Sequence, residues 1–473
     1  MKNLVLLLSL ITGASALPVR IESGSSPVPG RSTLMTLLES APDADTAADL
    51  LLQHYQKYSY PAVGVEVEDV KGTRRVLIDV SKFNHIWLSD GPERTKTIAT
   101  AQFTELSGGF VNLQDMQALL GSFHANPLHR TVPRLQPHPD GTSVNALLRI
   151  DQSQSQRFSA GFLDSGADPL PRERFWVQGE FADFWGLNSL STARLTFSPD
   201  PSDFHALQLG SRFFQTNGSE LGISTSYSGA DASTFDAYTW QIGGQWRSPE
   251  KDWQDWKIRS TLGLSYRRSN NALEFGDATN RGLADVFQFM IGGSMERTWA
   301  KGLTRASASL VLSPFGDDNE HDSLRPGAQG EYGIIRTSIW HRQDLGKGWD
   351  VIANLGGQWA SDPILQADQI ALGGASGLRG LPEQFALGDS GYLGGLELRT
   401  PVWNLPGNWA CRPSIFLQAG ETFDEVLKTS TSAVTSGFGL QLGQGDHLRA
   451  SLHAGWRLDE GGSEIHSQLT WKF

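Results

Sequence analysis

The stretch from Leu372 to Pro401, LGGASGLRGLPEQFALGDSGYLGGLELRTP, decides the fold of this chain. Eight glycines lie between residues 373 and 395, around Arg379 and Asp389. Glycine lets a backbone pass where side chains would clash, and a guanidinium in such a loop can form a bidentate pair with a carboxylate elsewhere. We therefore expect this loop to be tucked into another part of the protein.

Strands flank the loop on both sides. Upstream, the segment from Trp349 to Trp359 places apolar residues at alternate positions, and downstream Tyr392 to Val402 does the same through Leu396 and Leu398. Such alternation predicts strands with one apolar face. The loop therefore joins two strands, and at about 30 residues it is far longer than a normal hairpin connection.

The segment from Gln358 to Pro401 resembles a known family. It carries the pieces LRG, GD.G and E-L-R-x-P, in that order, at Leu378–Gly380, Gly388–Gly391 and Glu397–Pro401. This layout is similar to the conserved loop and following strand of two-partner secretion transporters (TpsB type, haemolysin-activator proteins) of the BamA-like superfamily. The resemblance implies an outer-membrane translocator that exports a large β-rich partner protein of the haemolysin or adhesin type.

The same resemblance implies that the loop is locked against the barrel wall. The lock residues are Leu378, Arg379, Gly380, Gly388, Asp389 and Gly391. In the family the loop arginine meets the acid of a Phe-x-Asp strand motif, and the matching residues here are Phe416 and Gln418, so that an amide stands where the acid is expected. Leu381 also stands where an aromatic residue is usual. The partner of Arg379 is left open between Gln418, Glu421, Asp389 and another wall acid.

The composition excludes several classes of protein. Apart from the N-terminus, the 473 residues hold no apolar run long enough for a membrane helix, whereas 51 glycines, 15 tryptophans and alternating strands fit a membrane β-barrel. The single Cys411 provides neither an intramolecular disulfide nor a cysteine metal site. The net charge of -12 gives no reason to expect nucleic-acid binding.

The pattern of residues 1–16 predicts a secretory signal peptide. Lys2 is followed by an apolar core and by a small-x-small cleavage site at Ala14–Ala16. Residues 17–32 are rich in Pro, Ser and Gly and predict a flexible leader, with little room for a plug helix.

Two small α/β units are predicted next, at residues 33–82 and 83–152. The expected elements are a helix at Thr46–Tyr58, strands at Gly64–Val70 and Arg75–Val80, a helix at Val111–Phe123 with Asn112 as N-cap, and a strand at Ser143–Ile150. The segment Asn126–Ile150 resembles the end of the second POTRA domain of the same family. Exposed sheet edges of such domains can accept an extended peptide through main-chain hydrogen bonds.

Residues 153–473 predict an all-β transmembrane barrel that closes around the tucked loop 372–391. Repeated alternation over about 320 residues, at roughly 20 residues per strand and connection, gives about 16 antiparallel strands. Fourteen of the 15 tryptophans lie in this part, as the interfacial girdles of a barrel require. The last strand, Glu464–Phe473, resembles the signal read by the barrel assembly machinery, with Leu469, Trp471 and Phe473 as the residues that carry it.

Sites for covalent chemistry are weakly supported. The GDSG sequence around Ser390 copies a serine-protease motif but lacks the histidine context of a triad. The histidines His124, His129 and His138 have no metal-ligand spacing. The acidic cluster 317–322 reads as a hydrated extracellular loop rather than a cation site. We therefore expect no enzyme activity, no metal and no cofactor.

The resemblance implies the location and the partners. The barrel would lie in the outer membrane of a Gram-negative bacterium, with the POTRA-like domains in the periplasm. Its partners would be a secreted β-helical client, outer-membrane lipids and, during biogenesis, the barrel assembly machinery and periplasmic chaperones. The alternatives are a BamA-like factor that inserts other barrels and a passive porin.

Overall fold

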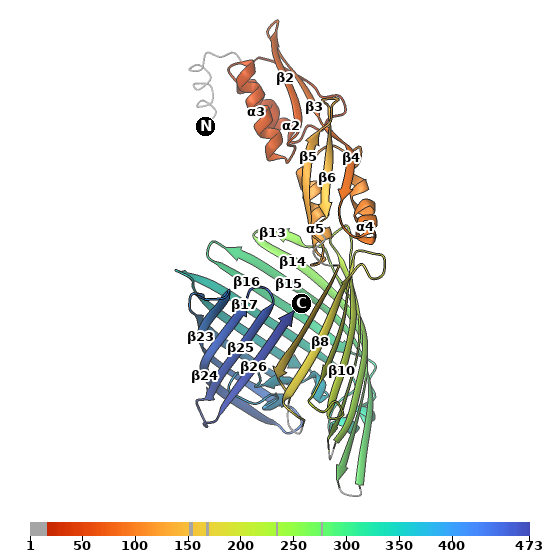
Figure 1. The fold of residues 1–473 in the computed structure, drawn as a ribbon, viewed down its shortest axis with the longest axis vertical. Coiled ribbons are helices and arrows are strands. Elements are labelled where there is room, and N and C mark those ends of the chain that lie inside the picture. The colour runs from red at the N-terminus through yellow and green to blue at the C-terminus, as the bar shows by residue number, and fades with distance from the viewer. Residues whose placement is uncertain (1–16, 151–154, 167–169, 233–234, 276–277) are drawn as a thin grey trace, which may run out of the picture. The chain divides into compact units, whose positions relative to one another are not determined.

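The computed structural model describes residues 17–150, 155–166, 170–232, 235–275 and 278–473 (Figure 1). The chain divides into two compact units, residues 1–153 and 154–473. The predicted signal peptide at residues 1–16 lies outside the described residues. No described helix is long and apolar enough to cross a membrane.

The first unit contains two modules that share the order strand, helix, helix, strand, strand. The first module consists of β1 (Val19–Glu22), α2 (Arg31–Ser40), α3 (Ala44–Lys57), β2 (Val63–Val70) and β3 (Thr73–Val80). Its sheet order is β1-β3-β2, with β1 parallel and β2 antiparallel to β3. The Asp43 side chain caps α3 by accepting from the Thr46 amide at 2.7 Å. All three elements predicted here, α3, β2 and β3, differ from their predicted bounds by no more than two residues.

The prediction of a flexible leader at residues 17–32 is wrong. Residues 19–22 form β1, whose Val19 and Ile21 are in register with Arg74 and Val76 of β3. Residue 31 already belongs to α2, which buries Leu34 and Leu38 completely. The apolar spacing of four residues places both leucines on one helix face, so this segment closes the core of the module instead of preceding it.

Arg74 connects the sheet of the first module to the end of α2. It is 1% exposed, and its Nη1 donates to the carbonyl oxygens of Leu38 and Ala41 at 2.8 and 2.9 Å. Helix ends leave such carbonyls without intrahelical partners. Nε and Nη2 donate to the two carboxylate oxygens of Asp69 at 2.8 and 3.0 Å. The ion pair therefore caps α2 and holds it on the sheet.

The second module repeats the topology of the first. It consists of β4 (Lys82–Ser89), α4 (Glu93–Phe103), the short 3-10 helix η1 (Thr104–Leu106), α5 (Leu113–His124), β5 (Thr131–Pro137) and β6 (Ser143–Ile150). The sheet order is β4-β6-β5, with β4 parallel and β5 antiparallel to β6. The predicted N-cap Asn112 accepts from the Gln114 amide at 2.8 Å, and β6 has the predicted bounds.

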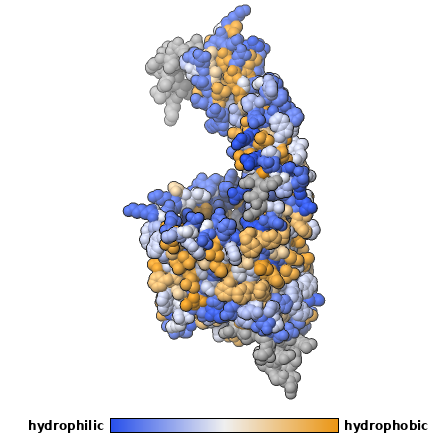
Figure 2. Space-filling model, in the orientation of Figure 1, coloured by the Kyte–Doolittle hydropathy of each residue, from blue (hydrophilic) through white to orange (hydrophobic). Residues whose placement is uncertain are grey.

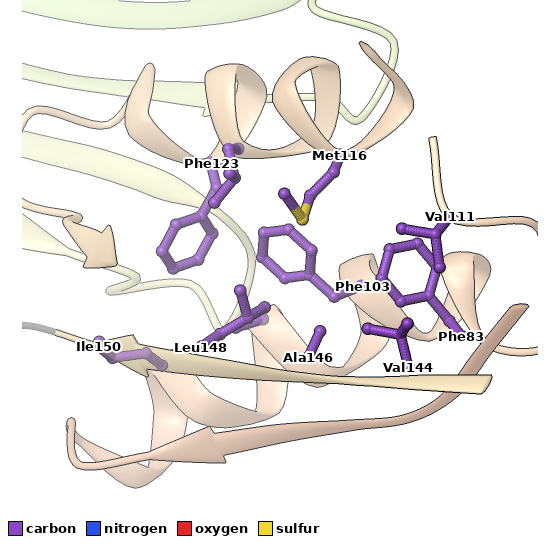
Figure 3. Packing of buried hydrophobic residues seen from close by; sticks show 11 residues of the cluster. Phe83, Phe103, Val111, Met116, Phe123, Val144, Ala146, Leu148 and Ile150 are labelled. Atoms are coloured by element: carbon purple, nitrogen blue, oxygen red, sulfur yellow. The ribbon is translucent and has the colours of Figure 1, made fainter. Parts of the chain in front are cut away.

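Apolar side chains fill the space between the helices and the sheet of the second module. Figure 3 shows Phe103, Met116 and Phe123 pointing from the helices toward Ala146 and Leu148 on β6. All of these side chains are less than 10% exposed. The module therefore has its own hydrophobic core, as a POTRA-like domain requires.

Sixteen antiparallel strands close the second unit into a barrel, so the predicted strand number is confirmed. The strands are β7 (Gln156–Asp164), β8 (Glu173–Ala182), β9 (Ser189–Phe197), β10 (Phe204–Phe214), β11 (Glu220–Ala232), β12 (Phe235–Arg247), β14 (Trp256–Phe275), β15 (Ala278–Trp299), β16 (Gly302–Ser313), β17 (Tyr332–Gly346), β18 (Trp349–Ala360), β21 (Ser390–Arg399), β23 (Trp409–Asp424), β24 (Thr429–Gln444), β25 (Leu448–Arg457) and β26 (Ser463–Lys472). The short strands β13 (Lys251–Trp253) and β22 (Trp403–Leu405) extend the pairing of β14 and β23.

The outer face of the barrel is apolar. Leu195, Leu264, Ile339, Leu355 and Leu417 are each more than 40% exposed, although they belong to five different strands. Figure 2 shows a hydrophobic belt around the visible face of the barrel, with hydrophilic residues on both sides of it. Alternation along each strand therefore places apolar side chains toward lipid and polar ones toward the lumen.

The barrel closes by pairing its last strand with its first. β26 is in register with β7 over five residues, from Gln468 opposite Leu163 to Lys472 opposite Ser159. The amide of Phe473 also donates to the Phe158 carbonyl at 3.1 Å. Trp471 and Phe473 are 57% and 62% exposed, so they belong to the outer face. Their role as an assembly signal stays a prediction.

Candidate functional site

The long connection between β18 and β21 lies inside the barrel. It contains the 3-10 helix η2 (Gln366–Asp368) and a small hairpin of β19 (Ile370–Leu372) and β20 (Ala386–Gly388). Leu372, Leu378 and Leu381 of this loop are at most 3% exposed and pack with Ala433 of β24. The loop therefore has its own apolar contact with the barrel wall.

Arg379 at the tip of the loop is 8% exposed and contacts two wall strands. Its backbone amide and Nε both donate to Oε1 of Gln418 on β23, at 2.9 and 3.1 Å. Its guanidinium lies over the Phe416 ring, 3.9 Å from the ring centre. The Gln418 amide in turn donates to the Gly377 carbonyl at 3.2 Å. Gln418 is thus both acceptor and donor to the loop, a double function that a carboxylate at this position would not have.

The acid that meets Arg379 is Glu397 on β21. Nη1 of Arg379 donates to Oε2 of Glu397 at 2.9 Å, and Nε of Arg399 donates to the other carboxylate oxygen at 3.0 Å. The candidate partners Glu421 and Asp389 are therefore wrong, because Glu421 accepts from the Tyr392 hydroxyl and Asp389 pairs elsewhere. The sequence contained the signal for Glu397. With Leu396 and Leu398 on the apolar face, the residue between them has to face the lumen.

Glycines let the loop backbone approach the barrel backbone. Gly380 has φ +99, and a Cβ there would lie 2.7 Å from the Gly455 carbonyl carbon on β25. A Cβ on Gly455 would lie 2.7 Å from the Arg379 oxygen. Gly388 and Gly391 are in a similar position, since a Cβ on either would lie 2.7 Å from backbone atoms of β23. His466 of β26 completes the contact, with Nε2 3.1 Å from the Leu381 oxygen.

Asp389 anchors the second end of the loop and is fully buried. Its carboxylate accepts from Arg325 at 2.5 and 3.0 Å and from the amides of Ile364 and Glu425 at 2.9 and 2.8 Å. Arg325 also pairs with Asp424 at 3.1 Å. Asp389 thereby joins three separate connections of the barrel. Nothing in the local sequence around Arg325 predicts this pairing, because 64 residues separate the two side chains.

A second buried carboxylate lies in the same loop. Asp368 is 4% exposed and accepts from both terminal nitrogens of Arg267 on β14, at 3.1 and 2.6 Å. The Tyr332 hydroxyl donates to it at 2.9 Å. Around this pair an apolar cluster joins the inner wall to the connections, and its buried members are Ala284, Val286, Val311, Ala328, Tyr332, Ile334, Ala360, Ile364 and Leu365. The loops thus form a packed layer within this end of the barrel.

The other candidate groups have structural partners. The acidic cluster is not a plain hydrated loop, because α6 (Asp318–Leu324) forms there and Asp317 caps it by accepting from the Asn319 amide at 2.8 Å. His321 is fully buried. Ser390 Oγ accepts from the Ala360 amide at 3.0 Å. Within the described residues no group of three or more His, Cys, Asp or Glu side chains could hold a metal ion.

Comparison with known proteins agrees with this geometry. Residues 252–442, which include the whole loop and the strands β21 and β23 that hold Arg379, match the model of the haemolysin secretion/activation protein ShlB/FhaC/HecB family. Over this part, which is less than half of its length, the chain is similar to that family.

Solved structures show a similar fold over nearly the whole chain. CdiB from Escherichia coli matches with a TM-score of 0.79 and 16% identity, over 98% of this chain and 91% of that chain. CdiB from Acinetobacter baumannii matches with a TM-score of 0.71 and 12% identity, over 97% and 90% of the two chains. BamA from Haemophilus ducreyi lacking POTRA domains 1-3 matches with a TM-score of 0.58 and 13% identity, over 96% and 99%. No curated protein sequence matches significantly.

Proposed function

We propose that this chain exports a large β-rich partner protein from the periplasm to the cell surface by threading it through the barrel. The observation that carries this proposal is the match to the haemolysin-secretion family over residues 252–442, the part that holds Arg379 against Gln418 and Glu397. Folding of the client outside the cell, together with its inability to slide back, would supply the direction of transport.

The periplasmic modules offer sheet edges for capture of the unfolded client. β2 lies at the edge of its sheet, is eight residues long and contains no proline. β5 lies at the edge of the other sheet, but Pro133 and Pro137 remove two of its amide donors. Main-chain pairing holds an extended peptide without reading much of its sequence. β2 is therefore the better capture edge of these two.

The lock around Arg379 would hold the loop in place while the barrel is closed. Removing the guanidinium leaves Glu397 with Arg399 alone and removes both the cation–π contact with Phe416 and the Nε bond to Gln418. The barrel strands are held together by their own main-chain pairing in addition to these contacts. We therefore expect Arg379→Ala to impair export more than it impairs barrel folding.

Secretion of a candidate partner, encoded beside this protein, tests the proposal. The partner is measured in the medium with the wild type, without the protein, with Arg379→Ala and with the control Arg305→Ala, whose ion pair with Glu296 joins β15 to β16. Heat-modifiable migration checks that each barrel is folded. We expect secretion to depend on the protein, to fall at least fivefold in Arg379→Ala and to stay near the wild-type level in the control.

Two outcomes contradict export. The first is a partner that reaches the medium without this protein, as expected if the barrel is a passive porin. The second is a loss of other outer-membrane barrels in cells without this protein, which would make it an assembly factor. Equal secretion by Arg379→Ala and wild type would be compatible with export but would show that the contacts of Arg379 are not needed for it.

A further inference from the structure

Three arginines form a column on one inner wall of the barrel. They are Arg174 on β8, Arg194 on β9 and Arg212 on β10. Their neighbours Phe175 and Leu195 are 39% and 42% exposed on the outer face, so alternation directs the arginines to the lumen. Two hollows confirm this direction, because Arg174 lines one of about 660 Å³ and Arg212 lines another of about 470 Å³.

Strand register gives the spacing of this arginine column. Arg194 is in register with Gln178 on β8 and with Gln208 on β10. Arg174 lies four residues before Gln178, and Arg212 lies four residues after Gln208, on strands that run in the same direction. At about 3.3 Å per residue, successive arginines are about 13 Å apart along the strands. The column therefore extends along the wall instead of forming a ring around it.

Within the described residues none of these guanidinium groups forms an ion pair with an acid. Each lies over an aromatic ring, with 4.1 Å from Arg174 to Phe204, 4.6 Å from Arg194 to Trp176 and 5.6 Å from Arg212 to Phe214. In the described part of the chain no carboxylate lies within 4.0 Å of any of the three. The wall acids pair with other arginines, as Glu180 does with Arg157 and Glu220 with Arg259. A guanidinium on a ring keeps its charge and free N–H donors. Arg194 and Arg212 present theirs to the lumen, whereas Arg174 is 5% exposed and donates to the Glu173 carbonyl.

We propose that the arginine column is a docking track for acidic segments of the exported polypeptide. This inference rests on the proposed export function and names the chemistry of the client. An extended chain advances about 13 Å in four residues, so Asp or Glu at every fourth position would meet successive arginines. The whole protein carries a net charge of -12, so that its overall charge does not attract acidic segments and any attraction has to come from local groups such as these arginines.

The track has the properties that passage requires. Its charges are separated, so that a segment can move from one arginine to the next instead of being held at a single tight site. The rings of Phe204, Trp176 and Phe214 give the passing backbone an apolar surface beside each charge. Binding of any one segment is therefore expected to be weak and dependent on salt.

Peptide binding to the purified full-length protein tests the track. The probes are fluorescent 13-residue Ser/Gly peptides that carry Asp at every fourth position, Asp at every third position, or Lys at every fourth position. Binding is measured by anisotropy at low and high salt. The variant Arg194→Gln/Arg212→Gln is compared with the control Arg130→Gln/Arg134→Gln, which removes the same charge from the periplasmic unit.

We expect the peptide with Asp at every fourth position to bind about tenfold more tightly than the other two, and the lumen variant to lose about tenfold in affinity. The control variant should bind as the wild type does. The proposal is overturned if the Lys peptide binds equally well, if Asp spacing has no effect, or if the control loses as much affinity as the lumen variant. Peptide binding is measured on the purified protein and does not depend on secretion. A failure of the export proposal is therefore detected by the secretion experiment and is distinguishable from a failure of the arginine column to bind acidic peptides.

Discussion

The two units of this chain place apolar side chains on opposite sides of their strands. In the second module of the N-terminal unit, Phe103, Phe123 and Leu148 are at most 1% exposed and form a core between helices and sheet. In the barrel, Leu355 and Leu417 are 53% and 51% exposed, and the buried positions hold charged residues as well as smaller apolar clusters. The same alternation of apolar and polar residues therefore directs apolar side chains into a protein core in one unit and to the outer surface of the barrel in the other.

This difference shows what holds each interior together. The modules of the first unit bury the charged side chain of Arg74 at less than 2% exposure. The barrel interior buries the carboxylates of Asp368, Asp389 and Glu397, and each is paired with an arginine. Hydrophobic burial therefore dominates in the first unit, whereas ion pairs and hydrogen bonds, together with local apolar contacts, fix the loops of the second.

The largest expected effect comes from breaking the polar interior of the barrel. Asp389→Ala leaves the guanidinium of Arg325 buried with Asp424 and a backbone carbonyl as partners and removes the acceptor for two backbone amides. Removing one partner of a buried ion pair costs about 3–5 kcal/mol. We expect protease cleavage within residues 361–390 while the strands stay paired. The matched control Asp362→Ala changes a side chain that bonds only the adjacent Ser361, and equal cleavage of both variants would refute the anchoring role of Asp389.

Two leucine substitutions test whether apolar side chains contribute more to stability inside the module core than on the outer face of the barrel. Leu148→Ala opens a cavity in the module core and is expected to cost about 3 kcal/mol. Leu355→Ala on the lipid-facing side removes contact area without enclosing a cavity, so we expect a loss of about 1 kcal/mol. Urea unfolding followed by helical circular dichroism reports the first variant, because the described helices other than the short α6 and η2 belong to the periplasmic unit. Heat-modifiable migration reports the second, and equal losses would refute the comparison.

The smallest expected loss of stability concerns the ion pair between Arg74 and Asp69 in the first module, in which the arginine is buried. The hydrogen bond from Arg74 holds the pKa of the partly exposed Asp69 carboxyl below its ordinary value. Asp69→Asn should therefore cost about 1 kcal/mol at neutral pH, since solvent screens the carboxylate.

The pH dependence of this effect has a definite sign. A lowered pKa means that the contribution of Asp69 is complete above the unfolded pKa of about 3.9 and is lost as pH falls through the folded value. The difference in urea midpoint between wild type and Asp69→Asn should therefore shrink below about pH 4. A difference that stays constant from pH 6 to pH 3 would show that the charge of Asp69 is irrelevant.

Much of this fold could be predicted because its signals are local. Alternation predicted the barrel and its strand number, and capping residues with helical spacing predicted α3 and α5. The segment 17–32 could not be predicted in this way. β1 has only four residues and pairs with β3, more than 50 residues later, and its Pro- and Ser-rich surroundings resemble those of a linker.

The candidate site shows the same limit. Arg379, Phe416 and Gln418 come together as the family resemblance implies, and alternation alone could have indicated Glu397. The pairing of Arg325 with Asp389 had no such signal, because contacts between two irregular connections follow neither strand nor helix periodicity. The role of the lock residues in export stays a proposal.

The short seam between β7 and β26 has a consequence for timing. The two strands are the first and the last of the barrel, and they are in register over only five residues. Because the ribosome makes β26 after the other fifteen strands of the barrel, the ring cannot close until all of them exist. Until then β7 has one unpaired edge that can pair with other chains.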